Sequence, residues 1–411
     1  MVAILFSILI SILYSRIDSY RVFQYSLVLL PLNYFIKGNP ERSIHFIVLG
    51  ITILAVVFDR NFGKCLDKKF LALWICLAAV LIFSSLFRGN TAQNWMDATW
   101  IYSCFIVWLI LSPPNRALRI HPFSIIVWSS FIAASLSLLF KVHLFHSFIP
   151  NSEKFTVNEW GFSRLAGVMG DFELFSELLV LGIVCVVHWT EAFRSKIIYT
   201  FAISIMFVAL LQTGTRSGLL VVPGVFFAVL SSKRRKSTLI YLSLFWFPIA
   251  YFLVGKFGIS LIARLNNLQT QQSFSILINR QRVWGVYDSL RPKYGFLGYG
   301  PRFPWDQFQL YPHSLVKTLL FTGGQAALAI FILSMLYVLV LNLGAYLQTK
   351  SKELAATSLL LILFLVNELK VEFIRQSNYI LLMSAFLAGI VAFANCEKLM
   401  ATKNLSRKID V

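Results

Sequence analysis

Long apolar stretches alternate with short polar connectors along most of this 411-residue chain. Two of them, Phe70–Phe87 and Phe123–Phe140, contain no charged residue. Each approaches the ~20 residues with which a helix crosses ~30 Å of hydrocarbon. Only 13% of the residues are charged, about half the share in soluble proteins. So many apolar blocks cannot be the buried cores of soluble domains, and the pattern predicts an all-α, polytopic membrane protein with one membrane domain, residues 1–411.

The pattern predicts about twelve membrane-spanning helices. A further apolar segment, Met1–Tyr14, resembles a signal-peptide core, but no small-residue cleavage site follows before Arg16. We expect this segment to be retained, as a short span or as a helix in the membrane interface. The twelve predicted spans are Val22–Ile36, Ile44–Phe58, Phe70–Phe87, Thr99–Leu111, Phe123–Phe140, Leu174–His188, Ile197–Leu211, Leu219–Leu230, Leu239–Val254, Leu319–Leu347, Leu354–Val366 and Tyr379–Asn395.

Charge in the connectors predicts the orientation. Lysine and arginine gather in every second connector, as the positive-inside rule requires of connectors that face the cytoplasm. The two longest connectors, residues 141–172 and 255–312, then lie on the outer face. The chain has a net charge of +19, but no recognition motif accompanies it, so we expect no nucleic-acid partner. The basic connectors are Asp59–Lys69, Asn115–Ile120, Glu191–Lys196, Ser232–Ser237, Thr349–Lys352 and the tail after Cys396.

The second long connector carries a surplus of positive charge on the predicted outer face. The positive-inside rule disfavours this surplus on the outer face, although long loops cross the membrane largely regardless of charge. Guanidinium groups match phosphate oxygens in pairs, and the surplus suggests an anion site. Apolar residues recur at near-helical spacing in Arg280–Leu290, which predicts an amphipathic helix on the membrane, and the glycines of YGFLGYGP predict a turn after it. The basic residues are Lys256, Arg264, Arg280, Arg282, Arg291, Lys293 and Arg302, against Asp288 and Asp306.

Two arginines are the first candidates for an anion site. Arg216 lies in QTGTRSG between two apolar spans, with glycines and hydroxyl donors on both sides. A charge at a helix end near the bilayer is costly unless it is paired or solvated. Arg282, with Arg280 beside it, opens the predicted amphipathic helix. The alternative for both positions is contact with lipid headgroups, by snorkelling or through the basic face of an interfacial helix.

His313 is the candidate general base. It lies between Tyr311-Pro312 and a long apolar span, and a histidine at a membrane–water boundary has a suitable pKa for this role. A structural histidine is the alternative. Arg164 and Arg375 are further candidates on the outer face. Asp171 and Glu173 have the spacing of a metal-binding pair, but acids at a helix start are the simpler interpretation.

No metal site or cofactor is predicted from the remaining motifs. The sequence lacks HExxH, paired cysteines, P-loop and dinucleotide fingerprints. The five cysteines are scattered, and we expect most of them to be small buried apolar residues.

Three segments in order resemble the O-antigen ligase/polymerase superfamily. They are QTGTRSGLLVVP, RQRVWGVYDSLRPKYGFLGYGP and HSLVKTLLFTGG. The segment RLAGVMGDFELFSELL and the position of Arg375 are also similar to this family, so that the resemblance covers Arg164 to Leu387. It implies a GT-C-like enzyme of the bacterial inner membrane that acts at the periplasmic face.

The resemblance also implies a mechanism. Arg216 and Arg282 would hold the pyrophosphate of an undecaprenyl-pyrophosphate-linked glycan donor, and His313 would deprotonate the acceptor hydroxyl. The reaction would invert the anomeric carbon and need neither metal nor cofactor. The acceptor would be lipid A–core in a ligase or another lipid-linked glycan in a polymerase, and the membrane lipids would surround both. Further substrate-binding candidates are Arg164, Arg280, Arg302 and Arg375.

The choice between ligase and polymerase depends on the histidine motif. The ligase motif places glycine ten residues and glycine, threonine or tyrosine thirteen residues after a His-Ser or similar pair, counted from the second residue of the pair. His313, Ser314 and Gly324 fit, but position 327 is alanine. The three matching positions favour a ligase over a polymerase. Because alanine at position 327 departs from the ligase motif, both enzymes stay open. A polysaccharide transporter is the alternative of another class, although no internal repeat is visible and the unusual charges lie at one face.

Overall fold

The structure is a computed structural model. It describes residues 19–32, 49–50, 53–54, 57, 64–87, 95–113, 121–141, 156–159, 162–188, 196–215, 218, 220–221, 224–225, 283–289, 295–301, 312–369 and 371–409. These residues are mostly helical, as predicted. The longer helices are α2 (Ser19–Val28), α4 (Lys68–Phe87), α5 (Trp95–Leu111), α6 (Pro122–Lys141), α7 (Phe172–His188), α8 (Lys196–Thr213), α14 (Leu315–Thr349), α15 (Lys352–Glu368) and α16 (Ser377–Ile409).

Several of these helices are apolar enough to lie in a membrane. Four have the length and composition of a membrane span: Lys68–Phe87, Pro122–Leu139, Leu315–Thr349 and Ser377–Thr402. Two shorter apolar helices cover Met96–Leu111 and Thr200–Thr213. An all-α membrane protein is therefore supported, and the number of twelve spans stays a prediction. The predicted segments Met1–Tyr14 and Leu239–Val254 lie outside the described residues, as do most of Ile44–Phe58 and Leu219–Leu230.

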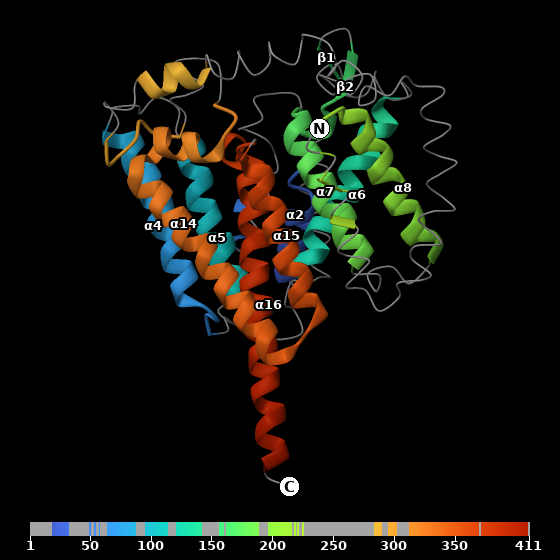
Figure 1. Ribbon diagram of the computed structural model, residues 1–411, viewed down its shortest axis with the longest axis vertical. Helices are drawn as coiled ribbons and strands as arrows, with labels where there is room; N and C mark the ends of the chain where they lie inside the picture. The colour runs from blue at the N-terminus through green and yellow to red at the C-terminus, as the bar shows by residue number, and fades with distance from the viewer. Residues whose placement is uncertain are drawn as a thin grey trace.

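The helices stand side by side in an upright bundle (Figure 1). Helices α4 and α14 run antiparallel, because Asp67 before α4 accepts a hydrogen bond from Tyr337 in the second half of α14 (2.8 Å). Asp67 also accepts one from Asn395 of α16 (3.0 Å) and caps the first turn of α4 through Phe70 N (2.9 Å). One buried carboxylate thus joins three helices at one end of the bundle, where burial without partners would be costly.

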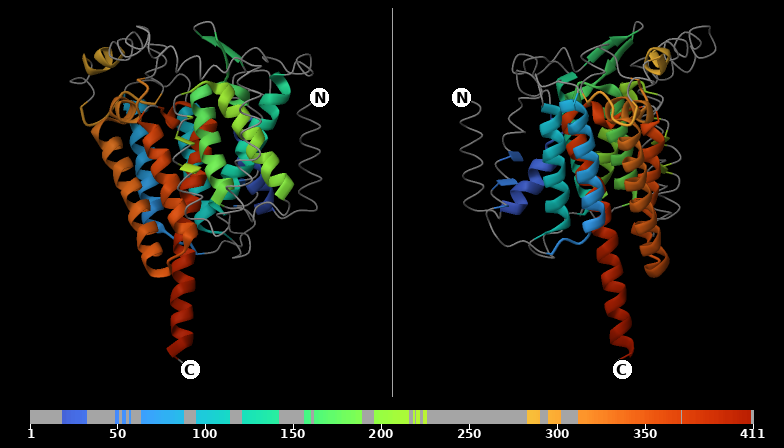
Figure 2. Two further views of the ribbon diagram at one scale, coloured as in Figure 1. Left: turned by 45° about the vertical axis from the view of Figure 1, so that its right-hand side comes forward. Right: turned by 90° about the vertical axis from the view of Figure 1, so that its left-hand side faces the viewer.

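The opposite end of the bundle carries parts of the two long connectors that the charge pattern predicts on the outer face of the membrane. Figure 2 shows the two strands and the short helix of residues 283–289 at that end, and the last part of α16 projecting from the other. The strands β1 (Thr156–Glu159) and β2 (Phe162–Leu165) form an antiparallel pair with Thr156 opposite Leu165. This short hairpin lies within the connector of residues 141–172, which was predicted as a loop, and the described residues remain mostly helical.

Helix α14 is broken one third of the way along. Gly324 has φ 67° and ψ −163°, which a residue with a side chain rarely adopts. The segment FLGYG, residues 296–300, packs into the break and satisfies backbone groups that the helix leaves without partners. Three hydrogen bonds make this contact: Tyr299 N–H to Phe321 O (2.8 Å), Gly300 N–H to Thr322 O (2.8 Å) and Ala326 N–H to Phe296 O (3.3 Å).

Glycine is required on both sides of this contact. A Cβ atom on Gly298 would collide with the backbone of Thr322, and one on Gly324 would collide with Phe296 O. The predicted turn is therefore a loop docked on a broken helix. Ala327, the position that departs from the ligase motif, is fully buried, and a Cβ atom on Gly323 would collide with its methyl group.

The predicted amphipathic helix of Arg280–Leu290 is helical over residues 283–289. Its Tyr287 is buried against Phe321 of α14, with ring centroids 4.7 Å apart. Trp284 Nε1 donates a hydrogen bond to Pro312 O (2.6 Å), immediately before His313. Asp288 pairs with Lys317 of α14 at 2.8 Å. This helix therefore contacts the start of α14.

Candidate functional site

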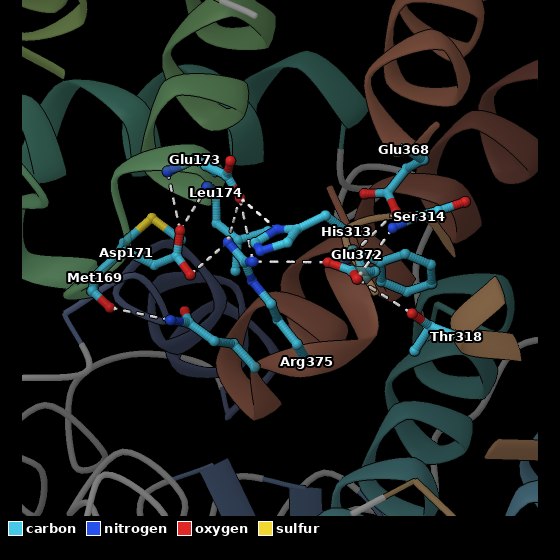
Figure 3. Close-up of polar contacts among 12 residues, drawn as sticks. Met169, Asp171, Glu173, Leu174, His313, Ser314, Thr318, Glu368, Glu372 and Arg375 are labelled. Atoms are coloured by element: carbon cyan, nitrogen blue, oxygen red, sulfur yellow. Dashed lines mark hydrogen bonds and ion pairs between the residues drawn. The ribbon is translucent and has the colours of Figure 1, made fainter. Parts of the chain in front are cut away.

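Three segments that are far apart in the sequence meet at the end of the bundle that carries the β1–β2 hairpin. They are the start of α7, the start of α14 with His313, and the short helix η9 (Phe373–Arg375) between α15 and α16. Figure 3 shows their side chains converging, with His313 and Arg375 turned toward Glu173. We call this group the His313 cluster: His313, Glu173, Asp171, Arg375 and Glu372.

His313 occupies an unusual backbone conformation just before α14. Its φ of 51° lies in the left-handed region, which is uncommon for a residue other than glycine. Such conformations cost roughly 1–3 kcal/mol and are maintained by their surroundings. Nδ1 of the ring lies 3.3 Å from Glu173 Oε2, and the side chain is 33% exposed. A carboxylate facing Nδ1 favours the proton on that nitrogen and leaves Nε2 as the basic atom.

The environment of His313 shifts its pKa upward. Burial alone would lower the pKa of His313, as would the charge of Arg375. The contact with Glu173 and the charge of Glu372 outweigh both, so the pKa lies above its ordinary value of 6.5. His313 is therefore a stronger base than an unperturbed histidine, and it needs a higher pH to be neutral.

Asp171 and Glu173 serve the start of α7. Asp171 Oδ1 accepts hydrogen bonds from the backbone N–H groups of Glu173 (2.9 Å) and Leu174 (3.1 Å), which makes it an N-cap. The interpretation as acids at a helix start is thus confirmed for Asp171. No group of three or more His, Cys, Asp or Glu side chains among the described residues could hold a metal ion. Glu173 contacts His313 and Arg375 instead.

Arg375 is surrounded by carboxylates. Its guanidinium contacts Asp171 Oδ2 at 2.5 Å, Glu173 Oε2 at 3.2 Å and Glu372 Oε2 at 3.6 Å, and its side chain is 8% exposed. The prediction placed Arg375 on the substrate. The structure places it on the acidic side of the cluster, where it fixes the position of Glu173 relative to His313.

Glu372 holds the start of α14. Its Oε1 accepts hydrogen bonds from Ser314 N (3.1 Å) and Thr318 Oγ1 (3.2 Å). A carboxylate at this place also faces the positive end of the helix dipole. Complete burial raises the pKa of Glu372, while the positive charges of Arg375 and His313 act in the opposite direction. Glu372 therefore fixes the backbone from which His313 projects.

Arg164 also contacts the start of α7, through the ring of Phe172. It is 4% exposed, its Nε donates to Thr213 O (3.0 Å), and its guanidinium stacks on the Phe172 ring at 3.4 Å. Thr215 follows at the end of α8, and its hydroxyl donates to Ser176 Oγ. Arg164 thus joins β2 to the segment that leads into QTGTRSG.

The remaining predicted arginines lie outside the described residues: Arg216, Arg280, Arg282 and Arg302. Their sequence neighbours are described. Thr215 precedes Arg216 and contacts α7, and Trp284, two residues after Arg282, contacts Pro312. These contacts join both segments to the elements that carry the His313 cluster.

An apolar groove runs along α14 and α15. It has a volume of about 260 Å³, and it begins at Leu315, two residues after His313. After the break at Gly324 it is lined by α14 from Leu328 to Leu339, which spans roughly 16 Å. Glu368, at the end of α15, is the polar residue of its wall. The groove has the length and chemistry to hold a hydrocarbon chain.

Sequence reasoning missed the acids that surround this site. Glu177, Glu368 and Glu372 are each at most 2% exposed. A signal was present, since ionisable residues within or beside apolar spans usually face the interior of a bundle and mark function. Glu177 lies in an apolar span, and Glu368 and Glu372 are four residues apart at the end of another.

Comparison with known proteins finds no family model and no curated protein that matches this sequence.

Proposed function

We propose that this protein transfers a glycan from an undecaprenyl-pyrophosphate carrier to an acceptor hydroxyl, by an inverting and metal-independent mechanism. The observation that carries the proposal is the contact of His313 with Glu173 (3.3 Å) at the mouth of an apolar bundle. A histidine oriented by a carboxylate is a recurrent general base. Here it stands beside a groove suited to a lipid chain.

The described residues account for the proton transfer. His313 Nε2 takes the proton from the acceptor hydroxyl while the acceptor oxygen attacks the anomeric carbon. The bond from that carbon to the pyrophosphate oxygen breaks, and undecaprenyl pyrophosphate leaves with the electron pair. Glu173 stabilises the imidazolium, and Arg375 holds Glu173 in place. General base catalysis of this kind contributes ~10²–10⁴ to the rate.

The leaving group needs surplus positive charge, and the His313 cluster does not offer it. The His313 cluster contains three carboxylates beside Arg375 and His313. We therefore assign the pyrophosphate to Arg216 and Arg282, with Arg164, Arg280 and Arg302 as further contacts. Guanidinium groups near a low-dielectric boundary stabilise the growing charge, and one such contact is worth about 10²–10³ in rate.

The groove along α14 and α15 is the proposed binding site of the lipid chain. Its apolar wall runs from Leu315 toward Leu339, and the His313 cluster adjoins its outer end. The polyprenyl chain would lie in this groove and reach it sideways from the bilayer, so that the pyrophosphate meets the site at the membrane surface.

We place the protein in a bacterial inner membrane with the site facing the periplasm. The clustering of Arg164, His313 and Arg375 at the end of the bundle opposite Lys68 and Lys350 supports this orientation. A reporter that is active only in the periplasm should work when it is fused within residues 255–312 and fail when it is fused after Arg235. The reverse pattern would place the site in the cytoplasm.

The acceptor distinguishes two enzymes. An O-antigen ligase would use lipid A–core, and a polymerase would use another lipid-linked glycan; the match of His313, Ser314 and Gly324 to the ligase motif favours the ligase. Purified protein should be incubated with a lipid-linked donor and each acceptor. Transfer to lipopolysaccharide core identifies the ligase, and lengthening of the donor glycan identifies the polymerase.

A transporter is the second candidate function, since the buried acids Glu177 and Glu368 lie within apolar helices as they do in proton-coupled transporters. Movement of the lipid-linked glycan across liposome membranes, with neither glycan product, would contradict the enzyme proposal.

A further inference from the structure

A second layer of polar side chains lies beneath the His313 cluster, inside the bundle. Glu177 is one helical turn after Glu173 on α7, and it is 1% exposed. Its carboxyl group faces Glu368 and Asn367 at the end of α15 and Tyr379 on α16. We call these four residues the inner acid site. None of the roles given above to the His313 cluster uses them.

The polar atoms of the inner acid site lack hydrogen-bond partners within the described part of the chain. This holds for both carboxylate oxygens of Glu177, both amide atoms of Asn367, Glu368 Oε1 and Tyr379 Oη. The other oxygen of Glu368 accepts a hydrogen bond from Phe373 N (3.0 Å). Buried polar groups are nearly always paired, because each one left unpaired costs about 1–3 kcal/mol. Asn367 Nδ2 and Tyr379 Oη can donate to these oxygens, but Glu177 and Glu368 also face each other, and two ionised carboxylates cannot donate to one another. The contact between the two acids therefore needs one more proton.

Charge in the surroundings does not neutralise the two acids. The charge of Arg375 is shared among Asp171, Glu173 and Glu372, and His313 contacts Glu173. An unpaired buried carboxylate costs several kcal/mol. Two carboxyl groups in contact avoid that cost when they share one proton, because the proton removes a charge and supplies the missing donor. The titratable or charged residues that face the pair are Glu372, Arg375 and Tyr379, and Asp171 in turn faces Tyr379.

We propose that Glu177 and Glu368 form a proton-binding site, in which one proton is held between the two carboxyl groups with Asn367 and Tyr379 as its walls. Binding takes one proton from water and forms an O–H···O bond between α7 and α15. The bound proton also removes a negative charge close to Arg375, so that the guanidinium stays with Asp171 and Glu173. The site does not depend on the proposed glycan transfer, and a proton-coupled transporter would need one of this kind.

The proton can be observed directly. Infrared spectra of the purified full-length protein in detergent should contain the C=O stretch of protonated carboxylic acids at pH 7 and at pH 8. The wild type should be compared with Glu177→Gln and Glu368→Gln, because glutamine has the shape of a protonated glutamate. Glu353→Gln, at the opposite end of α15, is the matched control. We expect the band to lose intensity in each of the first two variants and to be unchanged in the control.

Thermal melting gives an independent readout. Since the folded state binds a proton that the unfolded glutamates release, wild-type stability should fall as the pH rises from 5 to 9. The melting temperature of Glu177→Gln should fall less over that range and should equal or exceed that of the wild type at pH 7. A Glu177→Gln protein that melts well below the wild type at pH 7 would mean that the carboxylate is ionised and paired.

Two further outcomes would overturn the proposal. One is a wild-type spectrum at pH 7 whose carboxylic band is the same in both glutamine variants. The other is a melting temperature that rises when sodium chloride replaces choline chloride, in the wild type but not in Glu177→Gln. That result would make the inner acid site a site for a metal cation.

Discussion

Arg164 and Arg375 both contact the start of α7, and their surroundings differ. Both are almost completely buried, and the sequence made both candidates for binding substrate. Arg164 stacks on Phe172 and donates to Thr213 O, close to hydroxyl groups. Arg375 contacts three carboxylates within 3.6 Å. The same residue type at the same end of a bundle thus has different partners: a backbone carbonyl and an aromatic ring contact Arg164, and carboxylates contact Arg375.

The difference separates two halves of the proposed site. A pyrophosphate that approached Arg375 would have to displace carboxylates that already compensate its charge, so Arg375 is suited to positioning Glu173. The half near Arg164 leads into the segment of Arg216, which the sequence made a candidate for binding an anion. We therefore expect the acidic half to govern proton transfer and the arginine-rich half to govern binding of the donor.

The largest expected effect lies in the arginine-rich half. Arg216→Ala and Arg282→Ala should each reduce glycan transfer by ~10²–10³ while the protein still inserts and accumulates. Lysine at either position should restore little, because a point charge lacks the paired donors of guanidinium. Arg21→Ala, an exposed arginine of α2, is the control. Near-normal transfer in both alanine variants would favour the alternative that these arginines contact lipid headgroups.

Stability should distinguish Arg375 from Arg164 directly. Arg375→Ala leaves buried carboxylates without their cation and should lower the free energy of unfolding by about 3–5 kcal/mol. Arg164→Ala removes, among other contacts, the hydrogen bond to Thr213 O and the cation–π contact with Phe172, and the loss of these two should lower it by about 1–3 kcal/mol. Thermal melting in detergent measures both. If the Arg164 variant melts lower than the Arg375 variant, the carboxylates do not depend on Arg375 as described.

A smaller effect is expected in the pH dependence of transfer. Because the pKa of His313 is raised, wild-type transfer should decline as the pH falls through a midpoint above 6.5. Glu173→Gln removes the contact and the charge that raise this pKa, while burial and Arg375 still lower it. The midpoint should therefore move to lower pH, with a lower maximal rate. A midpoint that stays in place would mean that Glu173 does not control His313.

The sequence was sufficient for the outline of the molecule. Apolar length predicted helices such as α4, α6 and α14, and the residues at the start of α7 predicted the cap made by Asp171. The position of His313 just before a long apolar span made it a candidate general base. These properties are local, because periodicity, capping and charge can each be recognised within one segment of the chain.

The partners of each residue could not be predicted in this way. The contact of His313 with Glu173 joins residues 140 positions apart, and that of Arg375 with Glu173 joins residues 202 apart. The break at Gly324 also depends on a distant partner, the loop of residues 296–300, and the sequence indicated only a turn there. Whether an arginine binds an anion or a carboxylate is decided by such neighbours, and composition does not reveal them.

The most direct test of the account is the transfer rate of His313→Ala, measured together with donor binding. Purified wild type and variant should be mixed with a lipid-linked donor and acceptor, and product formation should be followed in a single turnover beside a binding assay. The control is His121→Gln, whose ring lies between Phe123 and Phe393. The account predicts that the His313 variant binds the donor as the wild type does and transfers glycan at least ~10²-fold more slowly. Transfer at the wild-type rate, with the donor bound, would contradict it.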